Sequence, residues 1–126
     1  ELVHQAGSRF GYIMTSGVIP LLDAFLESGI DALIGIDPAQ GKGTDLRLLK
    51  ERLGQRICLW GGVNGCLTIE KGTEKEVREA VQEGILVLGP KGFVLSPVDN
   101  VTDNSRKIWD NVATMIETWK EIMSRR

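Results

Sequence analysis

Cysteine and histidine are scarce in this sequence, which has two cysteines and one histidine among 126 residues. Cys58 and Cys66 are too few for a disulfide framework, so we expect a reducing, cytoplasmic compartment. No other Cys or His stands at metal-ligand spacing, so no metal site is predicted. His4 is expected to be a surface residue, and one histidine does not make a Cys-His or Ser-His-Asp catalytic set.

Long apolar runs and an excess of positive charge are also missing. No run approaches the roughly 18 apolar residues of a membrane-spanning helix, which argues against a membrane partner. Fifteen basic residues against 17 acidic ones give a net charge of -2, which argues against a nucleic-acid partner. The remaining composition, 42% hydrophobic and 25% charged, is typical of a soluble globular domain, here a single domain over residues 1–126.

Short apolar runs alternate with longer amphipathic segments, which predicts four strand–helix units. The expected strands are residues 12–15, 32–36, 57–60 and 93–96. Their helices are expected from Pro20 to Gly29, from Thr44 to Gly54, from Thr73 to Gly84, and from about 105 to 123. A glycine-bearing loop at 40–43 precedes the second helix. Residues 1–6 resemble the last turn of a helix, as in a piece excised from a longer chain.

Details of the last two units are less uniform. Thr73 and Glu76 form a capping box, and Gly84 is expected to end that helix. Residues 85–88 fit either a strand or a loop. In the final helix, Trp109 and Trp119 fall on the apolar stripe and are expected in the core. Trp60 fits either the core or a pocket wall.

Nearly continuous apolar strands predict a parallel sheet covered by helices. Two α/β architectures fit, an open doubly wound sheet or half of a TIM (β/α)8 barrel, whose full length is about 250 residues. A half barrel leaves one sheet face bare and two edges unpaired. It is therefore expected to form a homodimer or to associate with the missing half-barrel.

Each expected strand is followed by small or polar residues, and in parallel α/β folds functional residues lie at these carboxyl ends. These residues also make turns and caps, so the pattern alone leaves both interpretations open. The glycine-rich segment after the third strand is not a GxGxxG motif, so dinucleotide binding is not predicted. The candidate site residues are Ser16, Asp37, Gly61, Gly62, Asn64, Ser96, Asp99 and Asn100.

Three segments resemble the uroporphyrinogen decarboxylase superfamily. They are LWGGVNG at 59–65, GFVLSPVDNV at 92–101, and SGIDA at 28–32 leading into Ile36-Asp37-Pro38. The resemblance covers nearly the whole chain and falls on the last four units of that family's barrel. It implies a TIM barrel with its site at the carboxyl ends of the strands. Members decarboxylate tetrapyrrole acetate side chains without a cofactor, or transfer methyl groups to and from cobalamins or thiols, often with zinc.

The matched positions depart from both branches of the family. Asn64 stands where decarboxylases have an aspartate, and Asp99 where they have a histidine that binds substrate carboxylates. Met14 and Ser16 replace the His-x-Cys pair of the zinc-dependent methyltransferases. The resemblance therefore implies a decarboxylase-like carboxy-lyase with a diverged substrate, requiring no cofactor. A corrinoid-dependent methyltransferase without zinc, and a non-catalytic binding or scaffold piece, are the alternatives.

The candidate residues take different roles under this hypothesis. Asp37 and Asp99 would be the catalytic residues, as polar anchors or proton acceptors for a tetrapyrrole-like or methylated small molecule. The hydroxyl and amide side chains would donate hydrogen bonds to it. Gly61 and Gly62 would allow close backbone approach to a ligand or a neighbouring loop. An isolated half-barrel is expected to be inactive.

Overall fold

A computed structural model describes residues 1–40 and 44–125. Three residues of the predicted glycine-bearing loop, 41–43, lie outside this part. The described elements are α1 (Leu2–Gln5), β1 (Gly11–Ile13), η1 (Ile19–Leu21), α2 (Leu22–Ser28), β2 (Ala32–Ile36), α3 (Leu46–Leu53), β3 (Cys58–Asn64), the π-helix η2 (Gly65–Glu70), α4 (Glu74–Leu88), β4 (Phe93–Val98) and α5 (Arg106–Ser124).

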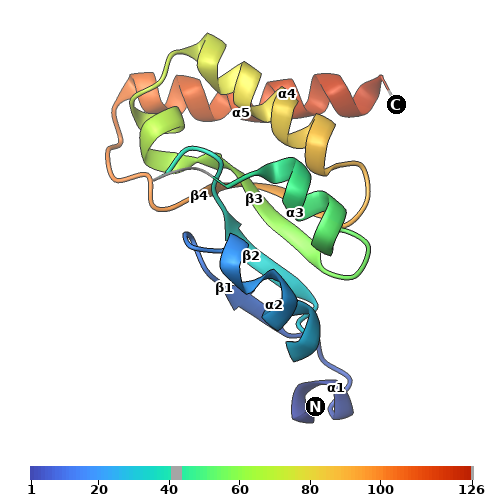
Figure 1. The fold of residues 1–126 in the computed structure, drawn as a ribbon. Coiled ribbons are helices and arrows are strands. Elements are labelled where there is room, and N and C mark those ends of the chain that lie inside the picture. Colours follow the sequence, from blue (N-terminus) through green and yellow to red (C-terminus); the bar gives the residue numbers. More distant parts are fainter. Residues whose placement is uncertain (41–43, 126) are drawn as a thin grey trace.

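The four strands of the described residues form one all-parallel sheet in the order β1-β2-β3-β4 (Figure 1). Each strand lies beside the next one in sequence, so the order never reverses as it does in a doubly wound sheet. The predicted α/β class and the parallel pairing are confirmed. Because all pairs are parallel, the four carboxyl ends lie along one edge of the sheet.

The helices α2, α3, α4 and α5 pack on one face of the sheet. Leu33 and Leu59 are paired in register and buried in a cluster with residues of α2, α3 and α4. A second cluster holds Val63 and Leu95, also on this face, against α4 and α5. Alternate side chains point the other way, because successive residues of a strand face opposite sides. That opposite face carries Ile13, Ile34, Trp60 and Val94, which are paired across all four strands.

The helix α4 is longer than predicted. Thr73 is its N-cap and forms the expected capping box with Glu76. The helix does not end at Gly84 but continues to Leu88, so residues 85–88 are helical. Ile85 and Leu88 are both buried, and a Cβ at Gly84 would lie 3.4 Å from the Gly62 carbonyl oxygen. This glycine therefore allows close helix–strand packing instead of ending the helix.

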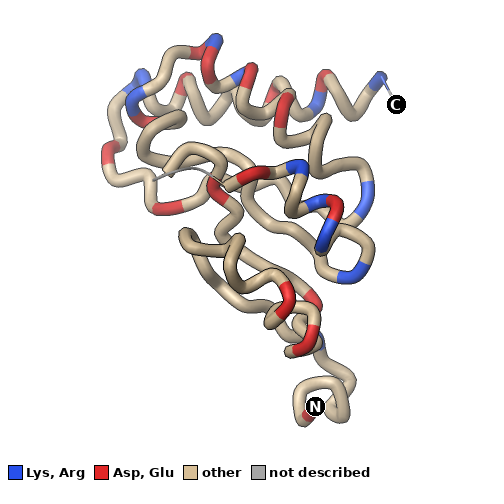
Figure 2. Tube along the Cα trace, viewed as in Figure 1, with Lys and Arg blue, Asp and Glu red and all other residues tan. Residues whose placement is uncertain are grey.

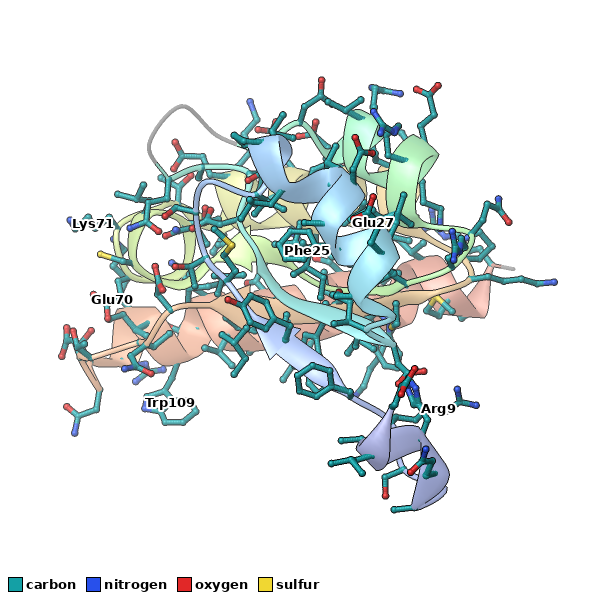
Figure 3. The ribbon with its side chains drawn as sticks, turned by 60° about the horizontal axis from the view of Figure 1, so that its bottom comes forward. Arg9, Phe25, Glu27, Glu70, Lys71 and Trp109 are labelled. Atoms are coloured by element: carbon teal, nitrogen blue, oxygen red, sulfur yellow. The ribbon has the colours of Figure 1, made fainter. Side chains whose placement is uncertain are left out.

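The buried face of α5 is only in part the predicted one, because Ile108, Val112 and Met115 of the apolar stripe pack inward but its tryptophans do not. Its buried residues are Ile108, Asn111, Thr114 and Thr118. The tryptophans expected in the core are exposed, Trp109 at 62% and Trp119 at 42%, and Trp109 projects outward from the helix (Figure 3). The polar residues face inward because they have partners there: the Asn111 amide donates to the carbonyl oxygens of Ile69 and Gly72 at 2.8 and 3.0 Å.

Smaller corrections concern element ends. Asp45, not Thr44, is the N-cap of α3, and its side chain accepts from the Arg47 and Leu48 amides at 3.0 Å. The strand β3 does not end before its two glycines but runs through them to Asn64. Among the described residues, no helix is both long and apolar enough to cross a bilayer.

Candidate functional site

A small pocket of about 120 Å³ lies on the helix-free face, toward the carboxyl ends of the strands. Its wall is mainly apolar, with three polar side chains among the lining residues. Trp60 is 40% exposed and lines this pocket. Of the two positions predicted for it, core or pocket wall, the structure shows the pocket wall. The lining residues are Ile13, Thr15, Ile34, Gly35, Trp60, Gly61, Ser96, Pro97, Val98 and Asp99.

Three of the eight candidate site residues line this pocket: Gly61, Ser96 and Asp99. Ser16 and Asn100 are exposed in loops and do not line it, whereas Thr15, beside Ser16, does. The Ser96 hydroxyl donates to the Pro97 carbonyl oxygen at 2.9 Å, which orients its oxygen. Of the candidate residues at the strand ends, three therefore line this pocket, and Thr15 instead of its neighbour Ser16 lines it beside β1.

Asp37 and Asn64 are buried, with 1% and 2% of their surfaces exposed, and they contact each other directly. The Asn64 amide nitrogen donates to Asp37 Oδ2 at 2.6 Å. Asp37 Oδ1 accepts from the backbone amides of Ala39 and Gln40 at 2.9 and 3.2 Å. Asn64 Oδ1 accepts from the Leu67 amide and so caps η2. This pair joins the loop after β2 to the turn after β3.

Gln40 connects the buried pair to the pocket. When its amide nitrogen faces the two carboxylates, it donates to Asp99 Oδ2 at 3.2 Å and to Asp37 Oδ2 at 3.3 Å. Asp99 has a φ of 66°, which is uncommon for residues other than glycine. Sequence reasoning placed Gln40 only in a loop, because no strand-end or motif signal marks it.

The two glycines of β3 lie very close to neighbouring segments of the same chain. A Cβ on Gly61, at a φ of +141°, would lie 2.5 Å from the Ile36 carbonyl oxygen and 2.9 Å from Val98 Cγ2. A Cβ on Gly62 would meet the Phe93 ring at 3.1 Å on the helix-covered face. The glycines were predicted to allow close backbone approach either to a ligand or to a neighbouring loop. The structure shows close approach to neighbouring segments of the chain.

The pocket offers few groups that could react with or bind a polar ligand. Among the described residues that line it, no lysine, arginine or histidine occurs, and Asp99 is the ionisable group. Thr15 and Ser96 add hydroxyls. Residues 1–40 and 44–125 contain no group of three or more His, Cys, Asp or Glu that could hold a metal ion. A corrin ring is far larger than this pocket and would have to lie over the helix-free face.

A second polar cluster lies at the opposite end of the sheet. Asp31, immediately before β2, accepts from His4 Nε2 at 2.7 Å, Arg9 at 2.9 Å and the Phe10 amide at 2.7 Å. The Phe10 amide, then His4 and Arg9, lower the pKa of Asp31 far below its ordinary value of 3.8. As predicted, His4 is a surface residue, and it fixes α1 to the amino end of β2. In a parallel α/β fold this end serves stability.

No family model matches the sequence, and no curated protein matches it significantly. The resemblance to the uroporphyrinogen decarboxylase superfamily therefore stays a prediction.

Proposed function

We propose that this chain corresponds to the C-terminal four units of a uroporphyrinogen decarboxylase-like TIM barrel and that its pocket binds a small-molecule substrate. The observation that carries the proposal is the sequential parallel sheet with helices on one face and a polar-tipped pocket on the other. An open sheet of this kind is what half of a (β/α)8 barrel looks like, and barrel enzymes bind substrate at the carboxyl ends of their strands. The resembling segments 59–65 and 92–101 contribute six of the ten residues that line this pocket.

The residues divide into a contacting set and a supporting set. Asp99, Ser96 and Thr15 would touch the substrate, with Asp99 as anchor or proton acceptor. Asp37 and Asn64 are buried and fully engaged in hydrogen bonds, so they would position the rim instead of reacting. In a decarboxylation, the C–C bond to the carboxyl carbon breaks, CO2 leaves, and the carbon left with the electron pair takes up a proton. That chemistry needs no cofactor.

The charge of Asp99 favours a diverged substrate over uroporphyrinogen. A carboxylate at the rim repels the carboxylates of a tetrapyrrole at neutral pH, and no cation lines the described pocket to offset it. Methyl transfer from a corrinoid is the second candidate function, because a mainly apolar wall with Trp60 suits a methyl group. Both cysteines are unpaired, consistent with the proposed cytoplasmic location.

The test assays the protein, as its gene encodes it, against two probes. Conversion of uroporphyrinogen to less carboxylated porphyrinogens is followed by chromatography, and demethylation of methylcobalamin with a thiol acceptor is followed by absorbance. Asp99→Ala should reduce turnover of the accepted probe at least about 100-fold, as loss of a positioned polar group does. Asp110→Ala, which changes an exposed aspartate of α5, is the matched control and should retain activity.

A protein that turns over and binds neither probe would exclude both the tetrapyrrole decarboxylase and the corrinoid methyltransferase and would favour the scaffold alternative. Equal activity in the Asp99 and Asp110 variants would show that the pocket is not the site.

A further inference from the structure

The pocket at the carboxyl ends of the strands combines an aromatic ring with a carboxylate. Trp60 lies in the inner strand β3, paired in register with Ile34 and Val94 of the two neighbouring strands, and it is 40% exposed. Asp99 directly follows β4 and lines the same pocket. An indole attracts a cation to its π-system, and a carboxylate attracts it by charge. The two groups together therefore suit an organic cation.

Two carboxylates lie at this end of the sheet. The four strands contain no charged residue (Figure 2), and Asp37 and Asp99 directly follow β2 and β4. The Gln40 amide nitrogen, when it faces them, donates to one oxygen of each, so both carboxylates lie around a single atom. Within residues 1–40 and 44–125, neither forms a salt bridge. The electrostatic potential at this rim therefore favours a positively charged ligand.

The size of the pocket limits which group can enter it. Its volume is about 120 Å³, and a water molecule in the liquid occupies about 30 Å³, so the pocket holds about four non-hydrogen atoms. A trimethylammonium head, one nitrogen with three methyl groups outside the ligand chain, has this size. Its methyl groups match the apolar wall, which includes Ile13, Ile34 and Val98. An ammonium without methyl groups is more strongly hydrated and gains less from such a wall.

We propose that this pocket binds the N-methylated ammonium head of a small organic cation, with the methyl groups against Trp60 and the charge balanced by Asp99. Gln40 and the buried Asp37 hold the Asp99 carboxylate at the rim and do not touch the ligand. The inference rests on the proposed function in using this pocket as the ligand site, and it names the substrate class that the diverged pocket accepts.

The test measures binding to the protein as its gene encodes it, with three probes of similar size. Choline carries both the charge and the methyl groups. Dimethylbutanol, its carbon isostere, has the same shape without the charge, and ethanolamine has the charge without the methyl groups. Ligand-observed NMR titrations at matched ionic strength give each dissociation constant. The wild type should bind choline at least about fivefold more tightly than either other probe.

Two variants remove the two contacts one at a time. Asp99→Asn and Trp60→Leu should each weaken choline binding at least about threefold. Both should change the binding of dimethylbutanol much less, whereas a merely structural defect would weaken both probes alike. Asp110→Asn and Trp109→Leu, at exposed positions of α5, are the matched controls and should bind choline as the wild type does. Asp99→Asn, at an exposed residue, carries the test if Trp60→Leu does not fold.

The outcomes separate this inference from the proposed function. Equal affinity of the wild type for choline and dimethylbutanol, binding of neither, tighter binding of ethanolamine, or choline binding unchanged by Asp99→Asn would each overturn the inference. Choline binding without turnover of uroporphyrinogen or methylcobalamin would support it while the enzymatic proposal fails. Turnover of either compound by a protein that does not prefer choline would do the reverse.

Discussion

The buried contact between Asn64 and Asp37 gives the strongest test of how the site is built. Asn64→Ala removes a 2.6 Å hydrogen bond to a carboxylate that is 1% exposed, and it also removes the cap of η2. A hydrogen bond to a charged group contributes about 1.5–3 kcal/mol. Loss of an N-cap costs about 1 kcal/mol. We therefore expect the free energy of unfolding to fall by about 3 kcal/mol, allowing for partial relief by water.

The assay is urea unfolding followed by circular dichroism, with every variant measured at the same protein concentration. A double-mutant cycle with Asp37→Ala isolates the pair: the double variant should lose clearly less than the sum of the single losses. Asn64→Asp should be more destabilising than Asn64→Ala near neutral pH, because it faces one carboxylate with another. A loss below about 1 kcal/mol, or additive single losses, would refute the reasoning.

Three further predictions concern other parts of the chain. Gly61→Ala should destabilise by about 3 kcal/mol, because the added Cβ meets the Ile36 carbonyl oxygen at 2.5 Å at a strained φ; an unchanged thermal midpoint would contradict this. Thr73→Ala should cost about 1 kcal/mol in urea unfolding by removing the capping box; no change would mean that the cap is redundant. The folded pKa of Asp31 is lowered, so its stabilisation is present above pH 3.8 and lost as the pH falls below it; the stability difference between wild type and Asp31→Asn should shrink on acidification, and a constant difference would exclude this linkage.

The strands and most helix starts could be predicted from the sequence because local signals specify them. Apolar runs bounded by glycine and proline marked all four strands, and the Thr73–Glu76 capping box marked the start of α4. The carboxyl-end rule then placed Ser96 and Asp99 at the pocket, since parallel pairing brings strand ends together.

The errors arose where distant contacts override local signals. Gly84 has the residue type of a helix end, but Ile85 and Leu88 continue the buried stripe, and the space beside Gly62 decides the outcome. Periodicity found an apolar stripe on α5 but not that Asn111 has partners near η2, which turns the tryptophans outward. Gln40 carries no sequence signal, because its bridging of two carboxylates depends on the fold of the loop.

In α5, the residues that hold the helix against the rest of the chain and the large apolar residues that are exposed lie on different faces. Asn111 and Thr118 fix its rotation through contacts with η2 and with Arg78 of α4, whereas Ile116 and Trp119 take no part in those contacts. Substitutions on the outward side can therefore change the exposed surface of this helix while its interior contacts stay intact. During evolution, a binding partner at this helix could therefore be gained, exchanged or lost with little change in the free energy of folding.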